Sequence, residues 1–151
     1  MGLNNNISDN NIQIRLATQS DLNSITHYIK LFDLDDRALH YTQFVVAEIN
    51  HQLVGFIRIR KHASCDELCS LAVLESYRKL GIAQALILKK IQLATQPIYL
   101  CTIIPAYFTA FGFEISHYFP TEIQDKLQYC TSALTVEEPY VVMTYSKNNN
   151  S

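Results

Sequence analysis

Alternating and periodic hydrophobic residues divide the chain into expected strands and helices. Ile12, Ile14 and Leu16 alternate with polar residues, which predicts a first strand. Thr18 and Asp21 then have the spacing of a capping box, which marks the start of a helix. The apolar positions of that helix recur at helical spacing and are Leu22, Ile25, Ile29 and Phe32. The chain therefore opens with a strand and an amphipathic helix.

The rest of the chain continues this alternation of strand and helix patterns. Strands are expected at 44–48, 53–61, 67–73 and 98–103, from Phe113, and at 140–145; helices are expected from the Gly81 turn to about Gln96, at 107–111 and at 121–130. The turn residues 50–52 join the first two of these strands into a hairpin, and Pro97 ends the long helix. The order βα(α)βββαβαβαβ predicts an α/β (α+β) fold, with helices on the faces of a mixed sheet.

Composition agrees with one globular domain. The 151 residues are 48% hydrophobic, and the apolar pattern runs through residues 12–146, which we expect to form a single domain with a substantial core. The Asn-rich ends, residues 1–11 and 147–151, have too few apolar side chains to bury and are expected to be disordered tails.

Charge and cysteine usage narrow the choice of partners and compartment. With 12 Lys and Arg against 14 Asp and Glu, the net charge of −2 provides no positive field for nucleic acid. The longest apolar run, around 82–88, is too short to cross a membrane, and no signal peptide is visible. The four cysteines form no CxxC pair, so we expect reduced thiols, a cytoplasmic location and no metal.

Glycine occurs only four times, so three of its positions inside the expected domain are informative. Gly55 lies within the second hairpin strand, where a small residue allows a bend or a close approach. Gly112 is placed to close the short helix at 107–111. Gly81 lies in the turn 78–83, RKLGIA, between a strand and the long helix.

That turn has the chemistry of an anion site. The first N–H groups of a helix have no helical acceptor, and the helix dipole adds a partial positive charge there. Gly81 and Ala83 let the backbone approach a ligand closely, and Arg78 and Lys79 add positive charge. A pyrophosphate-bearing ligand fits these features, and a helix entry with an ordinary glycine is the alternative.

Two segments resemble the GCN5-related N-acetyltransferase (GNAT) superfamily. One is the strand Leu71-Ala72-Val73 followed by RKLGIAQAL, and the other is YFTAFGFE, some thirty residues further on. The resemblance covers most of residues 12–146 and implies a mostly antiparallel sheet of six or seven strands flanked by helices on both faces. It also implies acetyl-CoA as the co-substrate and, since dimers are common in the family, raises the alternative of a homodimer.

The resemblance assigns a cofactor site residue by residue. In the family, the pattern (Q/R)xxGx(G/A) binds the pyrophosphate of acetyl-CoA through backbone N–H groups. Arg78, Gly81 and Ala83 fill its three defining positions, and the rest of the loop is Lys79, Leu80, Ile82 and Gln84. The strand Leu71, Ala72 and Val73 would pair with the pantetheine arm, and the Val73 N–H would stabilise the oxyanion on the thioester carbonyl.

Glu67 is the candidate general base. It stands fourteen residues before Gly81, the spacing at which histone-acetylating members of the family carry their catalytic glutamate. Acetyl transfer needs a base because the attacking nitrogen must be neutral, whereas an alkylammonium is mostly protonated at pH 7. The alternative is that Glu67 only caps or solvates the start of its strand.

The expected acid departs from the family pattern. Family members commonly read FYxxxGF, with a tyrosine that protonates the leaving thiolate, but Phe108 occupies that position beside the cofactor. Tyr107 lies one residue earlier, and on a helix one residue turns a side chain by about 100°. Tyr107 is therefore either a displaced acid or a packing residue. Without an acid, a thiolate of ordinary pKa is still a fair leaving group, so turnover would be slowed rather than abolished.

Arg58 and Arg60 are candidates for binding a substrate carboxylate, because side chains two apart on a strand share a face. The alternative is a solvated face. The segments ELCSLAV and PTEIQDKLQYC resemble the N-acetylglutamate-synthase-like branch of the family, which acetylates amino acids in some members.

The sequence thus predicts an acyltransferase: an acetyl-CoA-dependent N-acetyltransferase that acts by direct transfer on a small-molecule amine, such as an amino acid. The first alternative is a non-catalytic acyl-CoA-binding or sensing module of the same fold, which keeps the loop and lacks the acid at Phe108. The second is a structural domain that binds no nucleotide.

Overall fold

The computed structural model describes residues 11–133 and 137–145, which divide into two compact units. The first unit contains the residues up to Ile59 together with Ser70–Gln92, and the second contains Arg60–Cys69 and the residues from Leu93 on. The tails predicted at 1–11 and 147–151 lie, apart from Asn11, outside the described residues. A single domain over 12–146 stays a prediction.

Seven strands form one mixed, mostly antiparallel sheet in the order β1-β2-β3-β4-β5-β7-β6. Their bounds are Ile12–Leu16 (β1), Phe44–Ile49 (β2), Gln52–Lys61 (β3), Asp66–Val73 (β4), Ile98–Thr102 (β5), Glu114–Ile115 (β6) and Val141–Tyr145 (β7). β4 and β5 are parallel, whereas the pairs β1–β2, β2–β3, β5–β7 and β6–β7 are antiparallel. The predicted fold class is therefore confirmed.

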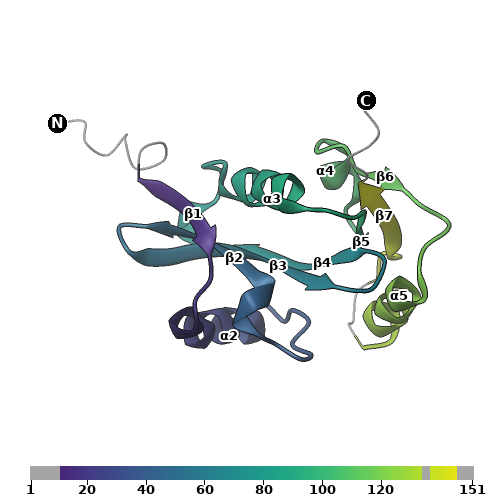
Figure 1. Cartoon of the computed structure of the whole chain (residues 1–151), viewed down its shortest axis with the longest axis horizontal. Coiled ribbons are helices and arrows are strands. Elements are labelled where there is room, and N and C mark those ends of the chain that lie inside the picture. Colours follow the sequence, from purple (N-terminus) through teal and green to yellow (C-terminus); the bar gives the residue numbers. More distant parts are fainter. Residues whose placement is uncertain (1–10, 134–136, 146–151) are drawn as a thin grey trace. The chain divides into compact units, whose positions relative to one another are not determined.

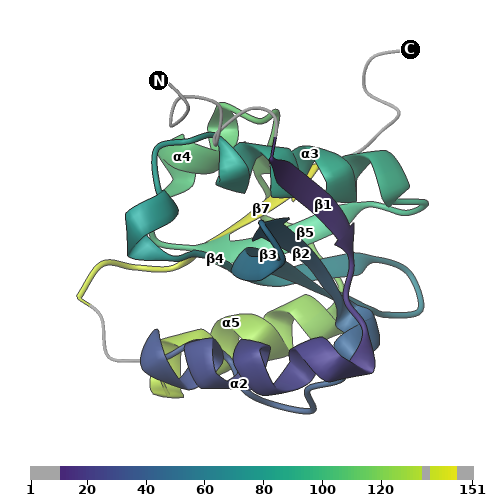
Figure 2. The same cartoon turned by 90° about the vertical axis from the view of Figure 1, so that its left-hand side faces the viewer.

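In the first unit, α2 (Leu22–Leu31) and α3 (Ile82–Leu93) lie on opposite faces of β1, β2 and β3 (Figures 1 and 2). A 3₁₀ turn, Gln19–Asp21, precedes α2. The Thr18 N–H donates to Asp21 Oδ2 at 2.7 Å, which confirms the predicted capping interaction. The polar start and the apolar stripe of α2 thus form the helix where the sequence predicts it.

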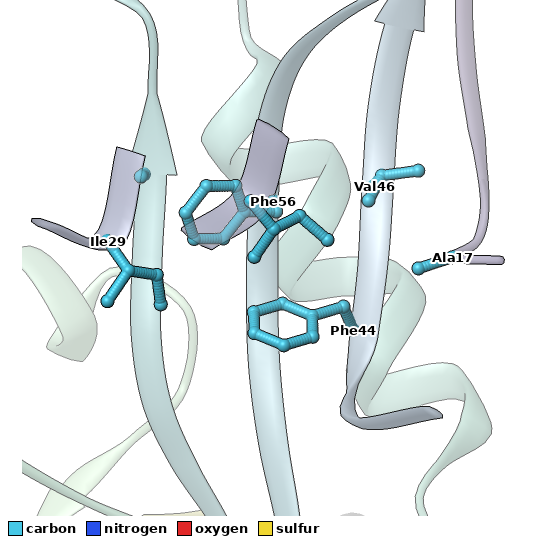
Figure 3. Close-up of a cluster of buried hydrophobic side chains, with 7 residues drawn as sticks. Ala17, Ile29, Phe44, Val46 and Phe56 are labelled. Atoms are coloured by element: carbon cyan, nitrogen blue, oxygen red, sulfur yellow. The ribbon is translucent and has the colours of Figure 1, made fainter. Parts of the chain in front are cut away.

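A buried hydrophobic cluster joins α2 to the sheet of the first unit. Its members are Ala17, Ile25, Ile29, Phe44, Val46, Phe56 and Ala72. Figure 3 shows how Phe44 and Phe56 from neighbouring strands meet, with ring centroids 5.6 Å apart in an edge-to-face arrangement. Each of these side chains is almost fully removed from water, so burial of apolar area holds the helix against the sheet.

Gly55 marks a close approach of two strands in the same unit. A Cβ atom at this position would lie 2.9 Å from the carbonyl oxygen of Ala72, closer than real Cβ atoms come to another atom. Any larger residue would therefore push β3 away from β4, and the predicted need for a small residue at Gly55 is confirmed.

In the second unit, α5 (Thr121–Ala133) packs on β5 and β7, and α4 (Pro105–Thr109) lies on their other side (Figures 1 and 2). The buried centre of this unit consists of Cys65, Ile123 and Val142, with Tyr99, Cys101, Phe119 and Leu127 packed against it. Gly112 follows α4 at φ +96, and the Phe113 N–H donates to the carbonyl of Phe108 at 3.3 Å. The predicted helix-closing glycine is confirmed.

Four predicted helix bounds were wrong. α4 ends at Thr109 instead of Phe111, and α5 ends at Ala133 instead of about Cys130. α3 ends at Leu93 instead of near Gln96, because the residue before a proline is disfavoured in helical conformation and Gln96 uses its side chain elsewhere. α4 begins at Pro105 instead of Tyr107, because proline is pre-organised for the first helical turn. No helix among the described residues is long and apolar enough to cross a membrane.

Candidate functional site

The segment between β4 and α3 passes twice through the left-handed region of backbone conformation. Lys79 has φ +67 and Gly81 has φ +84. A Cβ on Gly81 would meet no atom within 4 Å, so glycine is favoured here by its backbone conformation and not by crowding within the chain. Left-handed positions in a turn let neighbouring N–H groups converge on an anion. The turn thus leaves open space beside backbone donors.

The start of α3 supplies further donors. The Ala85 N–H donates to the carbonyl of Gly81 at 3.0 Å, which is an i to i−4 bond of the helix. The N–H groups of Ile82, Ala83 and Gln84 precede it, where a helix offers no acceptor. Buried Ile82 anchors the turn, whereas Gly81 and Gln84 are exposed. The predicted pyrophosphate loop is therefore accessible at the positive end of a helix dipole.

Arg78 ties this turn to the end of β4. Its Nε donates to the carbonyl oxygen of Val73 at 2.8 Å, and its guanidinium carbon lies 5.9 Å from the centroid of the Phe32 ring. Lys79 is exposed on the same turn. Leu71 and Val73 are half-buried. Ala72 belongs to the buried cluster of the first unit, so β4 is fixed at the point where the loop begins.

The ladder between β4 and β5 is short. Its register contains two pairs, Asp66 with Ile98 and Glu67 with Tyr99. The N–H and C=O groups further along that edge of β4 lie outside this ladder. An extended ligand can form backbone hydrogen bonds with such a strand edge.

Glu67 lies in the second unit within a cluster of polar side chains that we call the Glu67 cluster: Glu67, His62, Cys69 and Lys126. Its side chain is only 1% exposed. Oε1 lies 2.8 Å from Nε2 of His62, and Oε2 lies 3.7 Å from Nζ of Lys126 and accepts from Sγ of Cys69 at 3.4 Å. Glu67 is therefore a buried, multiply bonded carboxylate, and its role as the general base stays a prediction.

His62 is held in place by its own backbone. It lies in the turn between β3 and β4, where its N–H donates to the carbonyl of Cys65 at 2.8 Å. The side-chain amide of Gln96 donates to the carbonyl of His62 at 3.1 Å and to Oδ1 of Asp66 at 2.8 Å. The His62 side chain is 14% exposed, so it connects a buried carboxylate with solvent.

Neither His62 nor Lys126 could be recognised from the sequence as a partner of Glu67. His62 is five residues before Glu67, and the tight turn at 62–65 brings the two side chains together at the ends of adjacent strands. Recognising that turn in the sequence is the signal that could have found the pair. Lys126 lies on α5, far along the chain, and only the packing of that helix brings its ammonium group to the carboxylate. The partner of His62, Oε1 of Glu67, becomes visible only in the structure.

Tyr107 and Phe108 are both on α4 but differ in their surroundings. Phe108 is buried and packs against Phe113, whereas Tyr107 is 39% exposed and packs edge-on against Phe108 and Phe111. Desolvation raises the pKa of Tyr107 above its ordinary value, so its hydroxyl keeps its proton at neutral pH. The hydroxyl is thus available as a proton donor, and its role as the acid stays a prediction.

The two arginines of β3 differ more than their shared face suggests. Arg58 is fully buried, and its guanidinium donates to Gln43 Oε1 at 2.8 Å, to the Asp35 carbonyl at 2.9 Å and to the carbonyl of Arg37. These bonds fix the segment between α2 and β2. Arg60 is half-buried at the end of the strand. Substrate binding by either arginine stays a prediction.

The cysteines carry no sign of activation. Burial, together with the carboxylates of Glu122, Asp66 and Glu67, raises the pKa of the Cys65 thiol to about 11. A hydrogen bond with Cys130, followed by burial, raises the pKa of the Cys101 thiol. Over residues 11–133 and 137–145, no group of three or more His, Cys, Asp or Glu side chains could hold a metal ion.

A family model described as the acetyltransferase (GNAT) family matches residues 11–113. No curated protein sequence matches the chain. Among solved structures, N-acetylglutamate synthase from Neisseria gonorrhoeae, complexed with coenzyme A and N-acetyl-glutamate, is similar with a TM-score of 0.71 and 16% identity. The match covers 89% of this chain and 35% of that chain, so this chain spans about a third of the synthase.

Two other similar structures are matched along nearly their whole length. Rv2747 from Mycobacterium tuberculosis, in complex with CoA, has a TM-score of 0.72 at 17% identity and is covered to 98%, with 89% of this chain matched. Arabidopsis thaliana Naa50, in complex with the bisubstrate analogue CoA-Ac-MVNAL, has a TM-score of 0.69 at 19% identity and is covered to 99%, with 90% of this chain matched. At these identities the likeness establishes the fold.

Proposed function

Because the family match covers more than half of its length, the chain belongs to the acetyltransferase (GNAT) family, and on that premise we propose that it transfers the acetyl group of acetyl-CoA to a primary amine. The observation that carries the proposal is the turn 78–84. Gly81 is in a left-handed conformation directly before the donors that open α3, and among the described residues a Cβ built there would meet no atom within 4 Å beyond its immediate chain neighbours. A pyrophosphate fits such a turn.

We assign separate roles to the turn and to the residues of β4 that precede it. The loop residues Arg78 to Gln84 bind the pyrophosphate, and Leu71 to Val73 pair with the pantetheine arm through the strand edge. The Val73 N–H stabilises the oxyanion that forms when the amine attacks. Glu67, a buried carboxylate on β4, is the group on which removal of the amine proton depends.

The acceptor that we propose is a small molecule that carries an amine and a carboxylate. The likeness to N-acetylglutamate synthase, solved with N-acetyl-glutamate, supports an amino acid, and Arg60 is a half-buried cation at the end of β3. Naa50, solved with a peptide-bearing analogue, supports a peptide N-terminus instead. Both acceptors carry a primary amine, so the same acetyl-transfer reaction applies to either.

An acyl-CoA-binding or sensing module is the second candidate. The observation that favours it is Phe108, a buried phenyl ring where the family commonly has a tyrosine hydroxyl. A module of this kind keeps the loop and binds the co-substrate without turning it over.

Release of CoA thiol separates the two candidates. We expect acetyl-CoA to release thiol with at least one amine among L-glutamate, other amino acids, polyamines and the peptide MVNAL. Replacing Glu67 by Gln should lower the rate by about 10²-fold to 10⁴-fold, because it removes the carboxylate on which proton removal depends, while CoA binding persists. If CoA binds and no amine releases thiol, the sensing module is correct and the transferase is not.

A further inference from the structure

The contact between Glu67 and His62 joins a buried carboxylate to a side chain that reaches solvent. Nε2 of His62 lies 2.8 Å from Oε1 of Glu67, and the exposed fractions of the two side chains are 14% and 1%. We propose that His62 takes the proton from the substrate amine at Nδ1 and that Glu67 acts through it. This inference rests on the proposed function and assigns the atom that receives the proton.

The partners of Glu67 determine which nitrogen of His62 carries a proton. Lys126 places an ammonium group 3.7 Å from Oε2, and the Cys69 thiol donates to the same oxygen at 3.4 Å. The ammonium group and the thiol are both hydrogen-bond donors, so this carboxylate acts as an acceptor. An ionised carboxylate can only accept hydrogen bonds, so Nε2 of His62 must donate. In the neutral imidazole, Nδ1 is then unprotonated and able to accept a proton.

All the elements around Glu67 contribute to this arrangement. His62 comes from the turn between β3 and β4, Cys69 from β4 itself and Lys126 from α5. The carboxylate also interacts electrostatically with the thiols of Cys65 and, on β5, Cys101. Lys126 is the cation in this cluster, and it offsets the cost of burying the Glu67 charge.

The backbone around His62 is fixed before any substrate binds. The bond from its N–H to the Cys65 carbonyl closes the turn, and the Gln96 amide ties the His62 carbonyl to Asp66. The ring is therefore held at both its backbone and its Nε2 atom, as a proton acceptor with a fixed orientation requires.

The transfer step balances with this assignment. The ammonium form of the amine first loses a proton to water. The neutral nitrogen then attacks the thioester carbon, so a C–N bond forms and an electron pair moves to the carbonyl oxygen. His62 Nδ1 takes one N–H proton and becomes imidazolium, which ionised Glu67 stabilises through Nε2–H. Collapse of the intermediate breaks the C–S bond and leaves CoA thiolate. The proton on Nδ1 then passes to water or to the thiolate, which restores neutral His62.

The first test reads the tautomer of His62 directly and needs no substrate. Long-range ¹H–¹⁵N spectra of the wild-type protein at pH 8, assigned with His62→Gln, should show protonated Nε2 and unprotonated Nδ1. In Glu67→Gln we expect a mixture of tautomers, because the anionic acceptor is lost. Protonated Nδ1 with unprotonated Nε2 in the wild type would overturn the proposal.

The second test measures the effect on turnover with the best amine from the panel of amino acids, polyamines and MVNAL. His62→Ala should lower kcat by about 10²-fold to 10⁴-fold and leave the KM for acetyl-CoA nearly unchanged, and added imidazole should restore part of the rate. His51→Asn is the matched control, since that side chain is 97% exposed in another turn, and should keep the wild-type rate.

The outcomes separate the inference from the function on which it rests. If the wild type transfers acetyl groups and His62→Ala keeps its kcat, or imidazole restores nothing, His62 is not the proton acceptor although the transferase is correct. If the wild type neither binds CoA nor releases thiol, the proposed function fails, and the assignment of His62 as the amine's proton acceptor fails with it, whatever tautomer the spectra show.

Discussion

The buried charged side chains of Arg58 and Glu67 contact partners from other segments of the chain. Arg58 directs its guanidinium at carbonyls between α2 and β2, and Glu67 lies between His62 and Lys126. Burying an ion without such partners costs several kcal/mol, so these contacts are conditions for folding as well as for chemistry.

Lys126 provides a test of this balance. We expect Lys126→Met to destabilise the protein by about 3 kcal/mol, because it leaves the buried Glu67 carboxylate without the ammonium group at Oε2. Urea unfolding followed by circular dichroism measures the change. Lys30→Met, on the exposed side of α2, is the control and should stay near the wild type.

A double variant decides whether the charge is responsible for that loss. Adding Glu67→Gln to Lys126→Met removes the unpaired charge, so the pair should be more stable than Lys126→Met alone. Equal or lower stability of the double variant would show that packing of the lysine stem, and not charge, causes the loss.

Residue roles in the candidate site could be predicted only where the motif is local. Gly81 and Arg78 lie within six positions of sequence, and their backbone conformation and contacts agree with the predicted loop geometry. His62 and Lys126 depend on a tight turn and on the docking of α5, which the pattern of apolar residues does not specify. The departure at Phe108 was visible in the sequence, but its burial was not.

At the scale of elements, Arg15 joins three segments of the first unit. From β1 it binds both carboxylate oxygens of Asp21, at the start of α2, and reaches Oε1 of Glu48 on β2 at 2.7 Å. The bidentate bond to Arg15, aided by the Thr18 N–H, lowers the pKa of Asp21 to about 2. The start of the helix is thereby linked to the sheet through an ionised carboxylate.

This link makes stability depend on pH in a defined direction. The pKa of Asp21 is lower in the folded state than the ordinary value of 3.8, so its contribution is complete above about pH 4 and disappears as the pH falls towards 2. Asp21→Asn should be less stable than the wild type at pH 6 and should lose less stability between pH 4 and pH 2. Urea midpoints over this range measure the difference.

The control for this prediction is Asp125→Asn, an exposed carboxylate on α5. It should follow the wild-type dependence on pH. Parallel curves for the wild type and Asp21→Asn would contradict the proposed role of the Arg15 contact.

The identity and order of the elements could be predicted well because each has a clear hydrophobic period. β1 has the predicted bounds, and α2 begins where Thr18 and Asp21 indicate. The end of α3 was missed because Gln96 serves the turn at His62 instead of the helix. Pro97 also disfavours helical conformation at the residue before it, which contributes to the early end of α3. Pro105 favours the first turn of a helix, which explains the early start of α4.

At the scale of the whole molecule, family and fold agree, whereas the acceptor is a proposal. The similar structures include an amino-acid-acetylating synthase, of which this chain spans about a third, and Naa50, solved with a peptide-bearing analogue. The predicted homodimer stays a prediction. What the family shares is the acyl donor, so donor binding is the property on which every further assignment depends.

The most direct measurement is a thermal shift with CoA and acetyl-CoA on the wild type, Gly81→Ala and Asn50→Ala. At about 100 times Kd the ligand should raise the Tm of the wild type by about 5 to 10 °C. Gly81→Ala adds a Cβ to the open side of the turn at a left-handed position, so its shift should vanish. Asn50→Ala, at another left-handed position with φ +52, is the control for backbone strain and should keep the shift. No shift in the wild type, or a full shift in Gly81→Ala, would contradict the pyrophosphate site at the start of α3.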